Sequence, residues 1–192
     1  ISERRGRRRG RHGDHSLLGL LSRMSLIRHN FHALSEASLN NEVNRALRLS
    51  NDFLSTAFYF DRDDVALNNL HKFFFDLSEK KRQLAFTLIH YMQERGGRVQ
   101  LSPIRGPENK EWSSPAEALL QAIDHEQSTN KAFVALCEHA EKNEDPHLSD
   151  FVEEELLEPV VQQLKKLADL HTAAKRAGSG LGEYVFDKEL FD

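Results

Sequence analysis

The sequence predicts an all-α protein: a four-helix bundle with a long crossover loop in its middle and a short fifth helix near its C-terminus. Apolar residues recur at three- and four-residue steps through four long segments. Short polar turns join the segments within each pair, whereas a long segment containing Pro and Gly separates the two pairs. A long central connection makes the second pair run in the sense of bundles with one long crossover, although helix lengths and loops alone also leave cytokine-type bundles open.

The first helix is expected over residues 35–60, with Ser35 as its N-cap and Glu36 in its first turn. Its apolar face is formed by Leu39, Val43, Ala46, Leu47, Phe53, Leu54 and Ala57. After the polar turn FDRDDVA, the second helix is expected from about residue 65 to residue 94, because Gly96 and Gly97 provide a C-terminal stop.

Residues 98–114, with Pro103, Gly106 and Pro107, read as the crossing loop. The third helix is expected to begin near Ser114, with proline at its first position. The fourth follows the turn EDPH and runs to about residue 175, and LGEYVFDKELF forms the short fifth helix. Pro159 lies inside the fourth helix, where it removes a backbone hydrogen bond and predicts a kink.

Composition indicates a soluble, globular protein with one core. The chain has 192 residues, 39% hydrophobic and 29% charged, with no apolar run long enough to span a membrane. Cys137 is the single cysteine, so no internal disulfide can form and a reducing, cytoplasmic location is expected. The ten histidines show no zinc-binding spacing with this cysteine, to which no chemistry is assigned.

The charge is unevenly distributed. Residues 1–12 contain six arginines and one glutamate, a local charge of +5, so the other residues carry −9 of the overall −4. We expect residues 1–25 to be a disordered basic extension and residues 26–192 to be the folded domain. The segment Arg4–Arg11 suits phosphate contacts with nucleic acid. It fits a mitochondrial transit segment equally well, and a third interpretation is that it has no role. A nuclear or mitochondrial location is therefore the alternative to a cytoplasmic one.

Lys81 raises a question of its own. Phe73, Leu77 and Ala85 define the buried face of the second helix, and Lys81 falls on that face one turn before Leu84. A lysine is almost never fully buried without a partner. Either an acid lies opposite it, or its four-carbon stem carries the charge out to water.

Several local motifs resemble the eukaryotic ferritin family. They are LIRHNFH (26–32), FYFDRDDVAL (58–67), ERGGRV (94–99), EDPHLSDF (144–151) and SGLGEYVFDK (179–188), in the family's order and spacing. The resemblance covers residues 26–192. It implies a ferritin-like four-helix bundle and a subunit of a hollow 24-subunit shell that stores mineralised iron.

The same resemblance implies that the di-iron ferroxidase site of the catalytic heavy chains is degenerate. A site of this kind needs carboxylates and a Glu-x-x-His pair projecting into the bundle. Glu126 keeps its ligand position, facing Lys81. The other matching positions hold Ala46, Phe53, Lys80, Lys81, Leu84 and Val160. The chain is therefore predicted not to be an enzyme. As in the non-catalytic light chains, Lys81 and Glu126 are expected to form a buried ion pair.

Other positions that match the family have expected roles. Asp150 and Glu153 match the acids that line the threefold iron channels, although acids also suit a helix N-terminus on their own. With Glu126 they are the candidate metal-contacting residues. Asp76 and Glu79 match the mineral-nucleating cluster, where Lys80 and Gln83 replace acids. Leu181 and Val185 resemble the apolar fourfold-channel lining, from which Glu189 departs.

Two functions remain open on the sequence. The first is a non-catalytic subunit that builds an iron-storage shell, alone or with catalytic ferritin subunits, and admits iron without oxidising it. The second is a repurposed ferritin fold that no longer stores iron and binds partners or nucleic acid through its surface or Arg-rich tail. Asp150 and Glu153 favour the first function, whereas Lys80, Pro159 and the tail favour the second.

Overall fold

The computed structural model describes residues 25–191 and confirms the all-α fold class. The long helices are α2 (Ala33–Phe60), α3 (Asn68–Glu94) and α4 (Pro115–Lys142). A fourth is built from α5 (Pro146–Phe151), the π-helical segment η1 (Val152–Leu157) and α6 (Glu158–Ala177). The short α7 (Leu181–Lys188) and the 3₁₀ turn η2 (Glu189–Phe191) follow. No strand occurs between residues 25 and 191.

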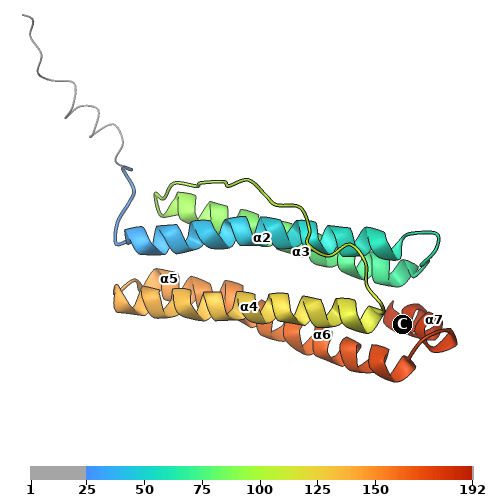
Figure 1. Ribbon diagram of the computed structural model, residues 1–192. Helices are drawn as coiled ribbons and strands as arrows, with labels where there is room; N and C mark the ends of the chain where they lie inside the picture. Colours follow the sequence, from blue (N-terminus) through green and yellow to red (C-terminus); the bar gives the residue numbers. More distant parts are fainter. Residues whose placement is uncertain (1–24, 192) are drawn as a thin grey trace, which may run out of the picture.

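The four long helices form two antiparallel pairs, α2 with α3 and α4 with the α5–α6 helix (Figure 1). The crossover loop runs along the first pair, so α4 begins at the opposite end of the bundle from the end of α3 (Figure 1). Asn40 and Asn44 of α2 fasten this loop: their amide nitrogens donate to the carbonyls of Arg98 and Gln100, at 2.9 and 2.8 Å. At the other end of the loop, the Tyr59 hydroxyl donates to the Trp112 carbonyl at 2.6 Å, so α4 begins beside the end of α2, as the predicted crossover topology requires.

The helix starts differ in how well the sequence predicted them. Ser114 caps α4 as expected, because its Oγ accepts a hydrogen bond from the Glu117 amide at 3.3 Å. The prediction of Ser35 as the N-cap of the first helix is wrong. His32 is the N-cap, and its Nδ1 accepts from the Leu34 amide, while Ser35 is buried inside α2. The helix starts earlier because Glu36, bound to Arg28 and to the Arg98 amide, anchors its first turn.

Proline at position 159 is accompanied by an irregular fourth helix. Residues 152–157 are wound as a π-helix, with the Glu158 amide donating to the Glu153 carbonyl five residues back, and Pro159 opens α6. Proline has no amide hydrogen to donate, so a wider turn just before it accommodates the missing α-helical bond. A π-helical stretch therefore precedes Pro159, and the kink expected there stays a prediction.

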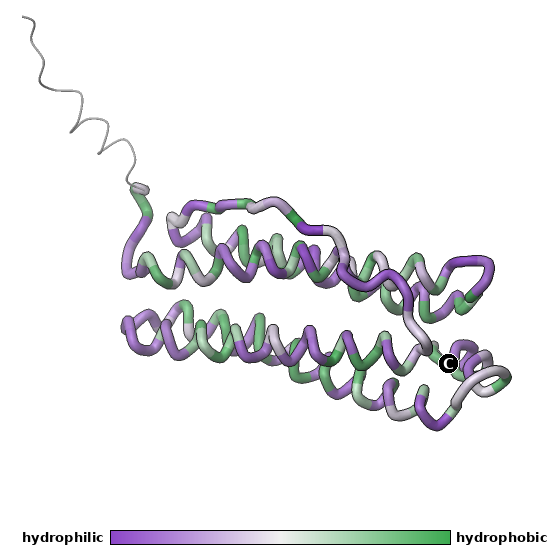
Figure 2. The backbone as a smooth tube through the Cα atoms, in the orientation of Figure 1, coloured by the Kyte–Doolittle hydropathy of each residue, from purple (hydrophilic) through white to green (hydrophobic). Residues whose placement is uncertain are grey.

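The core consists of two apolar halves separated by a polar layer. One half lies toward α7 and includes Phe60, Phe74 and Leu119, whereas the other lies toward the start of α2 and includes Leu39 and Phe133. The buried polar residues between them along the helices are Ser50, Ser78, Lys81, Glu126 and Thr129. Figure 2 shows the matching mixture of apolar and polar residues along each long helix. Among the described helices, none is long and apolar enough to cross a membrane.

Helix α7 is tied to the start of α3 by a carboxylate. Leu67, the N-cap of α3, makes no side-chain capping bond. Instead, Oδ1 of the buried Asp187 accepts hydrogen bonds from the amides of Asn69 at 3.0 Å and Leu70 at 2.8 Å. A negative charge at a helix N-terminus satisfies free amides and interacts favourably with the helix dipole.

We expect the substitution Asp187→Ala to lower the free energy of unfolding by about 1–3 kcal/mol, because it removes the cap and leaves buried amides unpaired. Chemical denaturation followed by circular dichroism measures the loss. Asp169→Ala is the matched control, since Asp169 pairs only with Lys165 at the surface of α6; it should change stability by less than about 0.5 kcal/mol. Equal effects of the two substitutions would contradict the capping role.

Candidate functional site

The centre of the bundle contains the ion pair expected from the sequence. The Lys81 Nζ of α3 lies 2.7 Å from each carboxylate oxygen of Glu126 on α4. Glu126 is fully buried and Lys81 is 6% exposed, so the lysine does not extend to water. A charged side chain at this depth needs an oppositely charged partner, and Lys81 and Glu126 are partners for each other.

The apolar residues at the other positions of the expected ligand set offer no metal ligand. Ala46, Phe53 and Val160 are buried, and Leu84 is half-buried against the same core half as Val160. None of these side chains carries a carboxylate or an imidazole. Among the expected ligand positions, Glu126 alone holds a carboxylate, and the ammonium of Lys81 contacts both of its oxygens.

A groove of about 730 Å³ between α3 and the η1–α6 helix opens onto the pair. Its lining includes the sequence-predicted residues Lys80, Lys81, Leu84, Glu126, Pro159 and Val160. Asp76, Glu79 and Gln83, the positions of the nucleating cluster, line it as well. Glu79 forms a partly exposed ion pair with Arg82 at 3.1 Å, so basic side chains lie beside this carboxylate.

Asp150 and Glu153 lie at the end of the bundle where the fourth helix begins, and both are exposed. Glu153 belongs to a group that the sequence did not predict: its carboxylate, the Cys137 thiol and the Glu141 carboxylate lie within 4.8 Å of one another. Burial raises the pKa of the Cys137 thiol, which keeps it protonated near neutral pH. The spacing of Cys137 and Glu141, four residues apart on α4, was the available signal.

Two other groups of predicted residues remain apart from the central pair. Leu181 and Val185 of α7 are exposed, at 77% and 41%. Glu189 is also exposed, in η2. The arginines of residues 4–11 lie outside the described part of the chain.

A long-crossover four-helix bundle with a short fifth helix and a charged pair at its centre defines a protein of the ferritin-like class. The family described as the ferritin-like domain matches residues 36–177. The chain is 44% identical to soma ferritin of Lymnaea stagnalis over 166 residues, 86% of this chain and 95% of the relative. It is also 44% identical to the ferritin-1 heavy chain of Schistosoma mansoni, over 86% and 96% of the two chains.

A third relative is the ferritin light chain, oocyte isoform, of Xenopus laevis, at 43% identity over 171 residues, 88% of this chain and 97% of the relative. The chain therefore belongs to the ferritin family, as the motifs of the sequence indicated. Heavy and light chains match it almost equally well. Overall identity therefore does not distinguish a catalytic from a non-catalytic subunit. The residues at the centre of the bundle must be compared instead.

We expect Lys81→Ala to destabilise the bundle by about 3–5 kcal/mol, because the Glu126 carboxylate is left buried without its partner. Lys80→Ala is the control, since Lys80 is the exposed neighbour on the same helix. The double substitution Lys81→Met with Glu126→Leu should recover most of the loss, because two apolar side chains need no partner. Chemical denaturation of the three variants measures these changes in stability. A Lys81→Ala variant as stable as the unmodified chain would contradict the buried pair.

Proposed function

We propose that this chain is a non-catalytic subunit of a ferritin shell, which helps to store iron and lacks a di-iron ferroxidase centre of its own. One observation carries the proposal: both oxygens of Glu126 contact the ammonium of Lys81. Two ferrous ions need several carboxylates and an imidazole, with open positions for oxygen. A single carboxylate beside a fixed positive charge offers neither the ligands nor the electrostatic attraction.

The proposed shell contains 24 subunits, formed by this chain alone or with catalytic ferritin subunits. The names of its relatives, which include heavy chains, light chains, and middle and lower subunits, are consistent with a subunit role. Exposed apolar residues such as Leu181 and Val185 on α7 provide surface for contacts between subunits. Oxidation of stored iron then falls to partner subunits, or proceeds slowly with oxygen in solution. A cytoplasmic location follows from the same proposal.

Iron reaches the interior, in this proposal, past Asp150 and Glu153. The exposure of both carboxylates at one end of the bundle leaves them free to face a channel between subunits. Three copies of each would form a negative funnel that concentrates divalent cations. Glu126 contributes little to iron binding because an incoming cation must displace the Lys81 ammonium. Lys80 and Gln83 in the groove make mineral nucleation at Asp76 and Glu79 weak.

The second candidate is a repurposed ferritin fold that binds a partner or nucleic acid. The exposed Lys80 and Lys166 along the groove favour it, as do the arginines of residues 4–11 in the sequence. The two candidates differ in what the purified chain does with iron.

Aerobic loading of the purified chain with ferrous iron, followed by size analysis, distinguishes them. We expect a 24-subunit particle that contains mineral, with iron oxidised no faster than in a protein-free control. The variant Ala46→Glu, Lys81→Glu and Leu84→His restores ligand types at the centre and should oxidise iron faster than the unmodified chain. A small oligomer without iron would support the second candidate, and rapid oxidation by the unmodified chain would contradict the first.

The channel role makes a separate prediction. The double substitution Asp150→Asn with Glu153→Gln should slow iron uptake into the assembled particle roughly tenfold at low ionic strength, because it removes the electrostatic attraction. Glu154→Gln, the adjacent exposed acid, is the control and should have little effect. Stopped-flow iron uptake measures both, and the difference should shrink as salt screens the funnel. Uptake that the double substitution leaves unchanged would exclude this route.

A further inference from the structure

Exposed carboxylates gather where α4 ends and the fourth helix begins. Residues 138–158 contain nine acidic residues and one lysine, Lys142, a local charge of −8 when histidine is neutral. Eight of these acids are exposed, whereas Asp145 is buried and pairs with Arg95 at 2.9 Å. Within residues 25–191, none of the eight forms an ion pair. We refer to the exposed acids of residues 138–158 as the acidic face.

Carboxylates of separate helices meet on the acidic face. One carboxylate oxygen of Glu141 on α4 and one of Glu153 on η1 lie within 4.8 Å of each other. Two negative charges at this distance repel each other, and a positive partner between them replaces repulsion by attraction. The acidic face therefore favours a cationic occupant.

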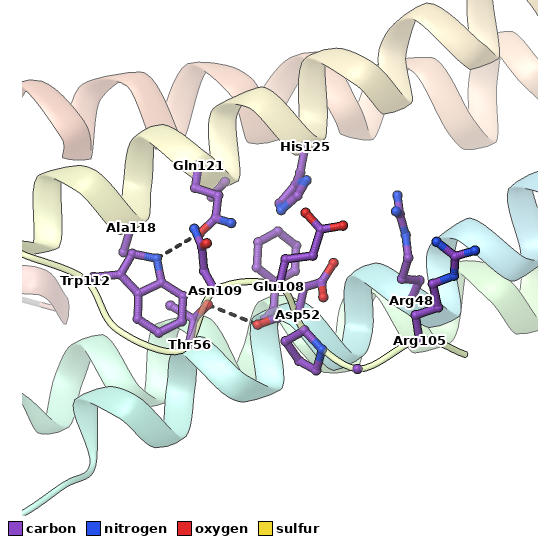
Figure 3. A pocket seen from close by; sticks show the side chains of 14 residues that line it. Arg48, Asp52, Thr56, Arg105, Glu108, Asn109, Trp112, Ala118, Gln121 and His125 are labelled. Atoms are coloured by element: carbon purple, nitrogen blue, oxygen red, sulfur yellow. Dashed lines mark hydrogen bonds between the residues drawn. The ribbon is translucent and has the colours of Figure 1, made fainter. Parts of the chain in front are cut away.

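The cavity under the crossover loop has a different balance of charge. Asp52, Glu108 and His125 line it, but Arg48 and Arg105 line it as well (Figure 3). Acids and arginines are therefore equal in number there, whereas the acidic face has eight exposed acids and one lysine.

The described part of the chain begins beside the acidic face. The side-chain Nδ2 of Asn30 donates to the carbonyl of Glu144 at 2.8 Å. The carbonyl of Asn30 accepts from Arg95 Nη2 at 2.8 Å, and the same nitrogen donates to Asp145 at 2.9 Å. The chain therefore enters the bundle at the turn between α4 and α5 (Figure 1).

The matching positive charges precede this entry point in the sequence. Residues 4–11 contain six arginines and no acid, and residues 12–24 separate them from Ser25. At about 3.3–3.6 Å per residue, this spacer reaches up to about 45 Å. The helix from residue 145 to residue 158 extends only about 20 Å. The arginines can therefore reach every acid of the face, at an effective concentration on the order of millimolar.

We propose that the arginines of residues 4–11 bind the acidic face of their own chain. A guanidinium group can donate two parallel hydrogen bonds to one carboxylate. Single exposed ion pairs contribute little, so the contact depends on several pairs forming together and weakens as salt screens the charges. It requires neither another subunit nor a metal ion and does not rest on the proposed storage function.

The proposed contact has a consequence for other ligands. The acidic face includes Asp150 and Glu153, so the bound arginines compete with cations at these carboxylates. The same arginines are then engaged within the chain and less available to the phosphates of a nucleic acid.

The test is trypsin digestion of the assembled full-length chain, because trypsin cleaves after arginine and a bound segment is protected. Cleavage within residues 4–11 should be roughly threefold or more slower in the unmodified chain than in Glu138→Gln with Glu141→Gln, at low ionic strength. Asp61→Asn with Asp63→Asn removes the same charge at the α2–α3 turn, at the opposite end of the bundle, and should leave the rate unchanged. High salt should make all three rates equal.

A cross-linking measurement locates the contact independently. The half-buried Cys137 has its thiol within 4.8 Å of the Glu141 and Glu153 carboxylates. A short bismaleimide should therefore join Cys137 to the thiol introduced by Gly10→Cys, and peptide mass spectrometry identifies the product. Adding Glu138→Gln with Glu141→Gln should lower its yield, and Cys137→Ser should abolish it.

Two results would overturn the proposal. One is a segment that trypsin cleaves equally fast in the unmodified chain and in the Glu138→Gln, Glu141→Gln variant, or that the Asp61→Asn, Asp63→Asn control deprotects to the same extent. The other is protection that appears only when a short DNA duplex is added, which would assign the arginines to nucleic acid instead. Size analysis confirms that every variant assembles as the unmodified chain does.

Discussion

The contact between the Lys81 ammonium and the Glu126 carboxylate governs the centre of this bundle. Both side chains are buried, and a buried charge without a partner costs free energy. The pair links α3 to α4 at the level where the two apolar halves of the core meet. The same contact occupies the carboxylate of Glu126, the candidate ligand position that still holds an acid.

The polar layer explains how a bundle can keep the ferritin fold and change its centre. Ser78 donates to the Ser50 carbonyl at 2.8 Å, which ties α2 to α3 next to the ion pair. The apolar halves on either side supply the hydrophobic stabilisation, which depends on buried area rather than on the identity of the central residues. A buried Lys–Glu ion pair at the centre is therefore compatible with the fold.

The charged groups outside the centre lie in separate regions of the molecule. The exposed acids Asp150 and Glu153 lie at one end of the bundle, whereas Asp52, Glu108 and His125 line a cavity under the crossover loop. Both groups lie apart from the groove that opens onto Lys81 and Glu126.

The sequence by itself determined the helices and the crossover, because apolar periodicity and turn residues are local features of the chain. It also predicted that Lys81 lies opposite Glu126, because the family motifs align both residues with facing positions. It misplaced the start of α2, where Ser35 looked like a cap, because Glu36 accepts a hydrogen bond from the amide of Arg98, which is 62 residues away in the chain. Only the tertiary structure decided that Asp187 caps α3 and that Asp52, Glu108 and His125 share a cavity. Such groupings depend on how separate elements pack, and no spacing along the sequence encodes them.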